Sequence, residues 1–389
     1  MKTKKKVCFY LNVLLVGGIE KVLLELLKNI DHNKYEVSLL IAYKLGKVEQ
    51  LKEEIPKNIE IKYLLTEEFL VKGKRKKVLG ELGKTEKILD ESMSFVRKGL
   101  IKRRVLEFIK DKDVIVDFDM TLAPYADKIN KKIITFCHFS PKNYNRGIKS
   151  RQVKHGKRLN AYDKVVVISD DMKKEMLEMY PFLEQKVIRI YNSFNINELE
   201  KKSLEIKEEY RQLIEENDYI LAIGRIEETQ KDFTTLIEAY NLVKDKITEK
   251  LFIIGDGRHK NQLIDLVEKY NLQKRIIFLG FISNPYPFIK GAKLFVHSSK
   301  FEGLPTVLIE ALILGKAIVA TDCPTGPREI LSNGENGILT NIFDVKSLGK
   351  GLEQVLTNEN LRKDYEEKTR NKIKEFDSSF VVKEFEKLL

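Results

Sequence analysis

Residues 294–320 restrict the fold of this chain most, because they read as a strand, a helix and a second strand in immediate succession. The apolar run Leu294–His297 leads through the loop SSKFEG into a helix that Pro305 opens, and residues 317–320 form the next apolar run. The apolar face of that helix is expected at Val307, Leu308, Ala311 and Leu312. Two strands joined in this way lie parallel in one sheet, and ligands of such sheets bind outside the carboxyl ends of the strands.

The same alternation of strand and helix recurs along the chain and predicts an α/β protein. Its 389 residues exceed what one core usually supports, so two domains are expected. Helical segments should fill 344–389, whereas residues 66–111 read as basic helix or loop and cannot be divided. The predicted strands are 6–11, 35–42, 59–64, 114–116, 133–136, 165–168 and 187–190, and then 219–223, 251–254, 276–279, 294–297, 317–320 and 337–339.

Composition indicates an intracellular protein without a metal framework. Three scattered cysteines, without CxxC spacing, argue against disulfides or a zinc site. The N-terminal run resembles a signal peptide, but Asn12 interrupts its apolar part and no small-residue cleavage site follows. No apolar stretch reaches the roughly 18 to 20 residues of a membrane span. We expect a cytoplasmic protein that is soluble or peripheral on a membrane.

The net charge of +12 is concentrated in the first half of the chain. Residues 1–200 hold 41 Lys and Arg against 28 Asp and Glu, whereas residues 201–389 hold 29 against 30. Residues 72–104 hold 12 basic and 4 acidic residues, and residues 131–160 hold 9 basic residues and no acidic one. Such segments bind anionic lipid headgroups or nucleic acid, although a solvated charged face is the plainer interpretation.

Polar residues and glycines at predicted strand ends mark candidate sites. Gly17 and Gly18 follow the first strand, where a glycine pair lets the backbone approach a ligand or simply makes a tight turn. His138 follows the strand at 133–136. Arg225 follows a strand and Lys231 precedes a helix expected from residue 232, so the helix N-terminus and two cations make a suitable seat for a pyrophosphate.

A second seat for an anion is expected where the helix after Pro305 begins. Amides near Thr306 and Val307 would hold a nucleotide-like anion, and Glu310, further along the same helix, would accept hydroxyl hydrogens. Glu302 and Glu310 also suggest a glycosidase, but eight residues of loop and helix place them further apart than its two carboxyls require.

Two other chemistries compete on the motif VIVDFDMTL. With Asp117 as nucleophile and Asp119 as acid it matches haloacid dehalogenase-like phosphatases, but Lys260 stands where their second magnesium-binding carboxylate is needed after Asp256. The same DFD also resembles a metal-binding DxD, which Arg225 and Lys231 make unnecessary. A basic nucleic-acid-binding protein is the non-enzymatic alternative, without an aromatic-basic motif to support it.

Taken together, five motifs strongly resemble glycosyltransferase family 4. They are FEGLPTVLIE, GRIEETQK, IIGDG, GFISNPYP and CPTGPREIL, and they cover the second half of the chain nearly end to end. The resemblance implies the GT-B fold, with two Rossmann-like parallel-sheet domains facing each other across a cleft. It places an acceptor domain at 1–200, a nucleotide-sugar domain at 201–375, and a last helix at 376–389 that returns to the first domain.

The resemblance also assigns roles to residues. Arg225 and Lys231 would contact the donor diphosphate, Glu310 the ribose, and Glu302 the transferred sugar. His138 would lie near the reacting centre as a positioning and electrostatic group. The catalytic set is thus His138, Glu302, Arg225 and Lys231, and donor binding would add Gly17, Gly18, Gly255, Phe281, Ile282, Gly303, Leu304, Pro305, Thr306, Val307 and Glu310.

The expected reaction is retaining transfer of a hexose or N-acetylhexosamine from a UDP-linked sugar. The acceptor would be a saccharide or lipid-linked saccharide of bacterial-type surface polysaccharide synthesis, as the form of CPTGPREIL suggests. No metal and no cofactor besides the co-substrate is expected. The basic first half suits an acceptor at an anionic membrane, on the inner face of the plasma membrane, and no nucleic acid is expected as a partner.

Overall fold

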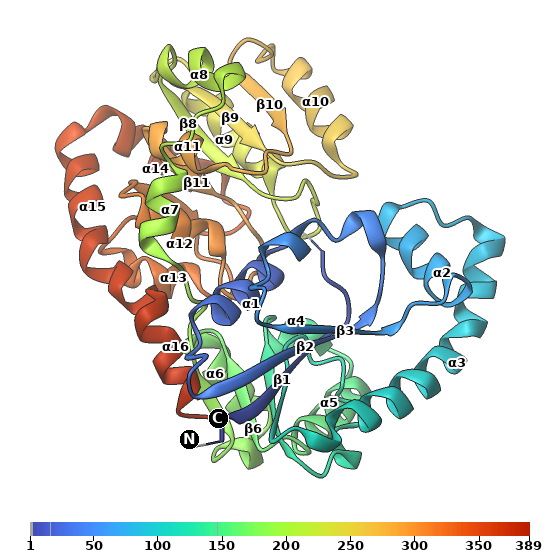
Figure 1. Ribbon diagram of the computed structural model, residues 1–389. Helices are drawn as coiled ribbons and strands as arrows, with labels where there is room; N and C mark the ends of the chain where they lie inside the picture. The colour runs from blue at the N-terminus through green and yellow to red at the C-terminus, as the bar shows by residue number, and fades with distance from the viewer. Residues whose placement is uncertain (1–2, 16, 146) are drawn as a thin grey trace. The chain divides into compact units, whose positions relative to one another are not determined.

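The computed structural model describes residues 3–15, 17–145 and 147–389 (Figure 1). The chain divides into two compact units. The first comprises Met1–Ile168, Lys173–Ser193 and Val381–Leu389, and the second comprises Ser169–Met172 and Phe194–Phe380.

The first unit is built on a seven-stranded parallel sheet in the order β3-β2-β1-β4-β5-β6-β7. Most of its strand residues are buried, as expected for a parallel sheet with helices on its faces. The register is continuous, with Val7 opposite both Val37 and Val114. The strands are β1 (Lys5–Leu11), β2 (Tyr35–Tyr43), β3 (Glu60–Leu65), β4 (Val114–Asp117), β5 (Lys132–Cys137), β6 (Lys164–Val167) and β7 (Val187–Arg189).

Helices join these strands as parallel crossovers require. The helix α16 (Ser378–Glu386), from the far end of the chain, adds its last part to this unit, where Phe385 packs its ring 5.8 Å from Phe9 and 5.7 Å from Phe136. The other helices of residues 1–193 are α1 (Gly18–Asn29), α2 (Glu68–Leu79), α3 (Lys84–Phe108), α4 (Pro141–Asn145), α5 (Lys149–Leu159) and α6 (Asp170–Met179).

The second unit contains a six-stranded parallel sheet in the order β10-β9-β8-β11-β12-β13. The first strand in sequence, β8, lies in the middle of this sheet. The strands β9 and β10 follow on one side of it and β11, β12 and β13 on the other, so the strand order reverses between β8 and β11. The strands are β8 (Tyr219–Ile223), β9 (Lys250–Ile254), β10 (Ile276–Gly280), β11 (Leu294–His297), β12 (Ile318–Thr321) and β13 (Ile338–Thr340).

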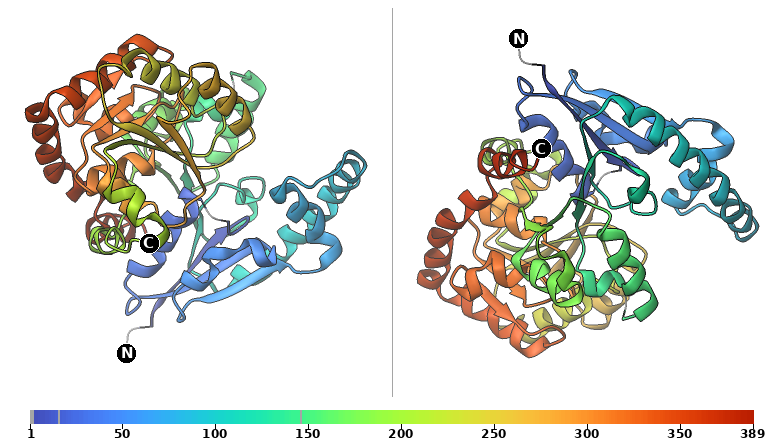
Figure 2. Two further views of the ribbon diagram at one scale, coloured as in Figure 1. Left: turned by 90° about the horizontal axis from the view of Figure 1, so that it is seen from above. Right: turned by 90° about the horizontal axis from the view of Figure 1, so that it is seen from below.

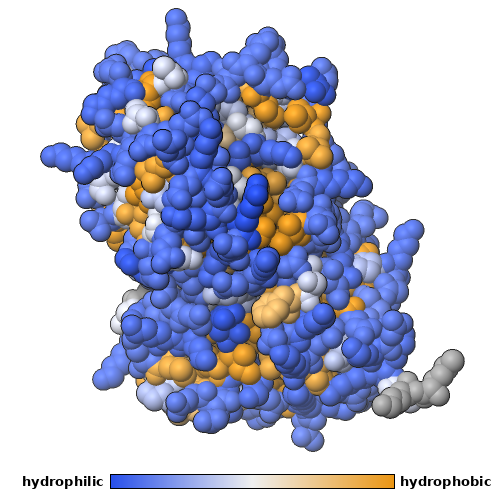
Figure 3. Space-filling model, turned by 90° about the vertical axis from the view of Figure 1, so that its left-hand side faces the viewer, coloured by the Kyte–Doolittle hydropathy of each residue, from blue (hydrophilic) through white to orange (hydrophobic). Residues whose placement is uncertain are grey.

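One apolar core joins this sheet to its helices, with α9 packed closely on α14. A side chain at Gly349 would place its Cβ 3.1 Å from the carbonyl oxygen of Ala239, so glycine permits this approach. Hydrophilic residues cover most of the face in Figure 3, on the side where α15 lies. The helices are α7 (Ile196–Lys202), α8 (Glu208–Glu215), α9 (Phe233–Val243), α10 (Lys260–Lys269), α11 (Tyr286–Gly291), α12 (Thr306–Ile313), α13 (Pro327–Ile330), α14 (Val345–Thr357) and α15 (Glu359–Lys372).

The predicted α/β class and all thirteen predicted strands are confirmed, with ends that differ by one residue at most. Residues 66–111, which the sequence left undivided, form mainly α2 and α3. Figures 1 and 2 show these helices side by side as a hairpin that projects beyond strand β3. Within the described part of the chain, none of the helices combines the length and the apolar character needed to cross a bilayer.

Candidate functional site

The carboxyl edge of the second sheet gathers most of the predicted site. Arg225 lies just beyond β8, Gly255 directly follows β9, and Phe281 directly follows β10. His297 ends β11, and Glu302 lies on the loop that follows it. Because all six strands are parallel, these positions share one edge, and β8 and β11 meet where the strand order reverses.

Glu302 is the centre of a buried charged cluster at this edge. Its Oε1 accepts a hydrogen bond from Lys231 Nζ and lies 3.3 Å from Nε2 of His297, while Oε2 accepts from the Gln230 side chain at 3.3 Å. The side chains of Glu302 and Lys231 are 9% and 17% exposed. The two residues predicted to bind the sugar and the diphosphate therefore form an ion pair with each other.

The electrostatics of this cluster keep Glu302 ionised. Burial acts to raise the pKa of the Glu302 carboxyl, but Lys231 and His297 together outweigh it and hold that pKa well below its usual range. Burial lowers the pKa of His297, against the opposing effect of Glu302. At neutral pH the Glu302 carboxyl is thus ionised and the His297 imidazole is neutral.

The backbone fixes the loop that carries Glu302. The Glu302 amide donates to the carbonyl of Pro324 at 2.6 Å, and the Thr325 hydroxyl donates to the carbonyl of Gly303 at 2.7 Å. Gly326 has φ +99°, and a Cβ there would lie 2.8 Å from the ring of Pro305, so the position demands glycine. The CPTG segment therefore supports the EGLP segment.

The N-terminus of α12 offers open amides. Pro305 is its N-cap residue and makes no side-chain cap, and within the described chain the Thr306 and Val307 amides have no hydrogen-bond acceptor assigned. Both residues are only partly buried. One turn along, Glu310 is buried and accepts from the Tyr286 hydroxyl at 3.5 Å. The expected anion seat at Thr306 and Val307 thus has the geometry that an anion needs.

The other expected anion seat, at the start of α9, is already occupied. The Glu228 carboxylate accepts from the amides of Phe233 at 3.0 Å and Thr234 at 3.3 Å, and Asp232 accepts from Thr235. This part of the sequence prediction is wrong, because two acidic side chains satisfy the amides that a pyrophosphate would need. Arg225, exposed just beyond β8, and Lys231 are the two predicted cations at this edge.

Two further predicted contacts lie at this edge. Gly255 has φ +144°, and a Cβ there would meet the carbonyl oxygen of Gly224 at 1.9 Å, so glycine is required by the close approach of two backbone segments. Phe281 exposes 62% of its surface, whereas Ile282 is buried. Leu304 is buried beside Gly303 in the EGLP segment that carries Glu302.

The predicted residues of the first unit lie at the carboxyl edge of its own sheet. His138 follows β5 directly, is buried, and donates from Nε2 to the carbonyl of Phe118 at 2.8 Å, which leaves Nδ1 as the acceptor nitrogen. Burial lowers the pKa of His138 to about 4. The imidazole is therefore neutral at neutral pH. It can take part in the proposed chemistry by hydrogen bonding, but not as a positive charge.

Gly17 and Gly18 follow β1, with Gly17 extended as the N-cap residue of α1 and Gly18 exposed as its first residue. A Cβ at Gly17 would lie 2.6 Å from an oxygen of Glu20, at the end of a flexible side chain. In the described structure, neither the backbone conformation nor a close backbone contact requires glycine at position 17.

The carboxylates of the DFDMT motif hold the local backbone. Asp117 is fully buried and accepts from the Thr121 and Leu122 amides and from the Tyr162 hydroxyl. Asp119 accepts from the Asn12 amide at 2.9 Å and from Thr121. Burial, together with the neighbouring Asp119, raises the pKa of Asp117 well above its usual range. A carboxyl committed in this way is a poor nucleophile or metal ligand, which argues against the phosphatase.

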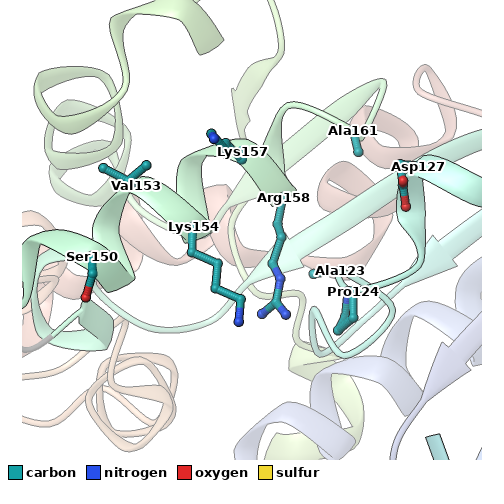
Figure 4. A pocket seen from close by; sticks show the side chains of 9 residues that line it. All are labelled: Ala123, Pro124, Asp127, Ser150, Val153, Lys154, Lys157, Arg158 and Ala161. Atoms are coloured by element: carbon teal, nitrogen blue, oxygen red, sulfur yellow. The ribbon is translucent and has the colours of Figure 1, made fainter.

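The second basic segment forms a shallow groove in the first unit, with a volume of about 470 Å³. Lys154 and Arg158 point side by side from α5 toward Ala123 and Pro124 (Figure 4). The remaining lining residues are Asp127, Ser150, Val153, Lys157 and Ala161.

His297 is the site residue that sequence reasoning missed. It is 4% exposed, and its Nε2 lies 3.0 Å from the Ser299 hydroxyl as well as near Glu302, while its Nδ1 has no partner among the described residues. Like His138, it lies at the end of a predicted strand, and this position could have identified it as a site residue.

Comparison with known proteins places these features in a family. The model "Glycosyl transferases group 1" matches residues 205–372, and the model "Glycosyltransferase Family 4" matches residues 16–198. An uncharacterised glycosyltransferase of Methanocaldococcus jannaschii is 31% identical over 294 residues, which cover 67% of this chain and 72% of that protein.

A second relative has a printed activity. The N-acetylgalactosamine-N,N'-diacetylbacillosaminyl-diphospho-undecaprenol 4-alpha-N-acetylgalactosaminyltransferase of Campylobacter jejuni is 31% identical over 216 residues, 56% of this chain and 57% of its own length. Among solved structures, Anabaena HepE in complex with UDP superposes with a TM-score of 0.77 at 17% identity, over 98% of both chains. Sucrose-phosphate synthase from Thermosynechococcus elongatus also gives 0.77, at 15% identity, over 99% of this chain and 98% of its own. The fold is therefore GT-B-like.

Proposed function

Since this chain belongs to the group 1 and family 4 glycosyltransferases, we propose that it is a retaining enzyme that uses a UDP-linked hexose or N-acetylhexosamine. The proposed acceptor is a lipid-linked saccharide, as in the Campylobacter relative whose name includes diphospho-undecaprenol. Surface polysaccharide synthesis is the proposed setting, supported by the capsular polysaccharide glycosyltransferase of Staphylococcus aureus, which is 25% identical over 58% of this chain.

One observation supports the donor site most directly. Lys231, Glu302 and His297 form a buried cluster, and the open amides of Thr306 and Val307 follow Glu302 by four and five residues. A cation and two helix N-terminal amides suit a diphosphate, and a carboxylate suits sugar hydroxyls. In the proposal Arg225 joins Lys231 on the diphosphate.

The remaining donor contacts follow from position. Glu310 accepts from the ribose hydroxyls, and it is buried near Tyr286 at the place where the helix amides would hold the phosphates. The backbone at Phe281 and Ile282 holds the base. Gly17 and Gly18 of the first unit contact the donor phosphates in this scheme.

The chemistry follows from charge development. As the glycosidic bond breaks, the sugar gains oxocarbenium character and the departing diphosphate gains negative charge. Cations and amides already in place stabilise that charge more in the transition state than in the ground state. The departing phosphate takes the acceptor proton on the same face, so the scheme assigns no protein base, and neutral His138 positions the acceptor by a hydrogen bond.

Lys231 has a particular part in this scheme, because its present partner is Glu302. A bound diphosphate offers Lys231 a second anion, and Glu302 then directs its oxygens to the hydroxyls of the transferred sugar. His297 and Gln230 keep the carboxylate in place during this exchange.

The basic first half supports the proposed location at an anionic membrane, peripheral and on the cytoplasmic side. Each lysine or arginine near such a surface contributes about 1 kcal/mol. Binding of this kind weakens as salt screens the charges.

The test is a panel of sugar nucleotides scored for slow hydrolysis, with UDP release as the readout. We expect one class of UDP-sugar to be hydrolysed by the wild-type enzyme. Glu310→Ala should lose donor binding while its thermal unfolding stays near that of the wild type. Hydrolysis of no member of the panel would contradict the proposed donor, and full activity of the variant would contradict the role of Glu310.

A further inference from the structure

The hairpin of α2 and α3, residues 68–108, carries apolar side chains on its outside and a charged pair on its inside. Arg97 is buried between the helices, where it forms an ion pair with Asp90 at 2.7 Å and donates to the Leu70 carbonyl at 3.4 Å. Phe95 is 86% exposed, two residues away on the same helix. This arrangement is the reverse of a helix that packs on a soluble core.

Helical periodicity places two of the exposed apolar residues, Ile88 and Phe95, on one stripe. Ile88, Ser92, Phe95 and Gly99 follow each other at steps of four, three and four, so they lie along one side of α3. At about 100° per residue, this side is opposite the buried Arg97, and it lies about 120 to 140° from Ile101 and about 80 to 100° from Val105.

The stripe is large for a soluble protein. Ile88 is 72% exposed and Leu89 66%, and Val96 is exposed beside Phe95. In α2 further apolar side chains are exposed, at Phe69, Val78 and Leu79. Large apolar side chains that gather exposed on one pair of helices are typical of interaction sites.

Cations surround the stripe. Of the 12 basic residues in 72–104, four form ion pairs with acidic side chains: Arg75, Lys76, Arg97 and Arg104. The other eight are in no ion pair within the described part of the chain: Lys72, Lys74, Lys77, Lys84, Lys87, Lys98, Lys102 and Arg103. The same segment offers only Glu81 and Glu91 as acidic side chains outside these pairs.

From this geometry we propose that the α2–α3 hairpin docks on an anionic lipid bilayer, with the Ile88–Phe95 stripe inserted among the acyl chains. Lys84, Lys87, Lys98, Lys102 and Arg103 of α3 then lie at the level of the headgroups. An apolar face between lysines and arginines is the pattern of a helix that lies in a membrane interface. Long lysine side chains reach the headgroups while their stems remain against apolar material.

The combination of charge and apolar side chains distinguishes the hairpin from the other basic surface of the first unit. The groove of Lys154 and Arg158 is basic but shallow, and its apolar lining is Val153, Pro124 and two alanines. The hairpin combines the excess of positive charge with large aliphatic and aromatic side chains at its exposed face. Only a surface that offers both anions and an apolar interior satisfies both features.

This inference deepens the proposed membrane location, and it rests on that part of the proposed function alone. It is tested with vesicles that contain neither donor nor acceptor. Failure of docking therefore leaves UDP release unaffected as a measure of the transferase, and failure of UDP release leaves docking measurable.

The absence of tryptophan from the sequence provides a clean probe. Phe95→Trp places one fluorophore on the stripe, and Phe182→Trp, at a phenylalanine that is 58% exposed in the same unit, is the matched control. With vesicles containing phosphatidylglycerol at low salt, we expect a blue shift of the Phe95→Trp emission and quenching by acyl-brominated lipid. Phe182→Trp should show neither.

Flotation of the same vesicles measures the binding itself. Phe95→Ser should reduce binding by roughly tenfold, because a large apolar side chain is withdrawn from the bilayer, while Phe182→Ser should leave it unchanged. The double change Lys98→Glu and Lys102→Glu should also weaken binding, and more strongly than Lys154→Glu in the groove.

Three results would overturn the proposal. The first is bound protein in which Phe95→Trp keeps a solvent-like emission. The second is equal loss of binding in Lys154→Glu and in the double hairpin variant. The third is a blue shift that depends on protein concentration without lipid, which would identify a second copy of the chain as the occupant of the stripe.

Discussion

Lys231 and Glu302 neutralise each other in the second unit, and neither has another fully charged partner of opposite sign in the described chain. Removal of one partner leaves the other charge buried. For a pair of this kind the cost is about 3 to 5 kcal/mol. The pair thus has a structural role besides the proposed contacts to diphosphate and sugar.

UDP distinguishes the proposed roles of Lys231 and Glu302, because it contains the diphosphate but lacks the transferred sugar. Lys231→Ala should weaken UDP binding and lower the free energy of unfolding. Glu302→Gln should leave UDP binding unchanged or tighter, because it frees Lys231, while transfer is lost with the sugar contact. Calorimetric titration with UDP and urea unfolding measure both quantities. Equal weakening of UDP binding in the two variants would contradict the assignment.

His155 provides a prediction on pH. Burial, aided by Arg158, lowers its pKa from 6.5 to about 4. The unfolded chain therefore binds a proton below pH 6.5 that the folded chain takes up only near pH 4, so this histidine lowers stability as pH falls through that window. Between pH 7 and pH 5 the loss is about 2 kcal/mol.

The variant His155→Gln should remove that loss. Its side chain can keep a hydrogen bond to Tyr180 or Asn145, which contact His155 Nδ1 at 3.2 Å. We expect the difference in unfolding free energy between pH 7 and pH 5 to change by about 2 kcal/mol relative to wild type. Buried acids such as Asp117 titrate in both proteins and cancel in this comparison. An unchanged difference would show that His155 is protonated in the folded protein.

At the scale of elements, α12 and α9 differ in what their N-termini offer. Glu228 caps α9 from five residues upstream, whereas Pro305 caps α12 without a side-chain acceptor. Thr306→Pro removes one open amide from α12 without breaking the helix, because proline is favoured at the first helical position. Pro305 already has the extended backbone that a following proline requires.

If the amide holds a donor phosphate, Thr306→Pro should weaken UDP binding by roughly 10- to 100-fold, the worth of a hydrogen bond to a charged group. Thr306→Ala, which keeps the amide, is the control and should bind within a few-fold of wild type. Thermal unfolding should be similar in both variants. Equal UDP affinity in the two would place the phosphates elsewhere.

The elements were largely predictable from sequence, and the reasons are local. Runs such as VVV in β6 and LFII in β9 are buried on both faces, which is typical of strands in a parallel sheet. The α2–α3 hairpin could not be divided, because the exposed Ile88 and Phe95 lie on a different side of α3 from the buried Ile101 and Val105, so the sequence shows no single apolar face. The sequence also did not show that the N-terminus of α9 is occupied, because the spacing of charges does not reveal that the Glu228 carboxylate accepts from its amides.

For the candidate site, the sequence predicted which residues share one edge of the sheet, but not which of them pair with each other. Arg225, Gly255 and Glu302 stand at one edge because each follows a parallel strand, and this rule needs no coordinates. The ion pair of Lys231 with Glu302 joins residues 71 positions apart, and only the packing of β8 beside β11 brings them together. His297 was missed because a histidine that ends an apolar strand usually belongs to the core.

At the scale of the whole molecule, the longest excursion of the chain from the first unit begins after Ser193 and ends at Val381. The two connecting segments pair with each other, since Phe194 donates to the carbonyl of Phe376 at 2.9 Å and Ser378 donates to that of Phe194 at 2.8 Å. The last residues of the chain are therefore part of the first unit's core, and loss of them should destabilise the first unit.

Phe385 tests this directly, because its fully buried ring packs on Phe9 and Phe136. Phe385→Ala should cost about 3 to 5 kcal/mol, since the cavity opens against a strand of the sheet. The matched control Phe380→Ala, at a residue 51% exposed in the same helix, should cost little. Hydrogen exchange should show faster opening of β1 and β5 in Phe385→Ala while β8 and β11 keep their protection. Equal loss of protection in both sheets would mean that the two units unfold as one.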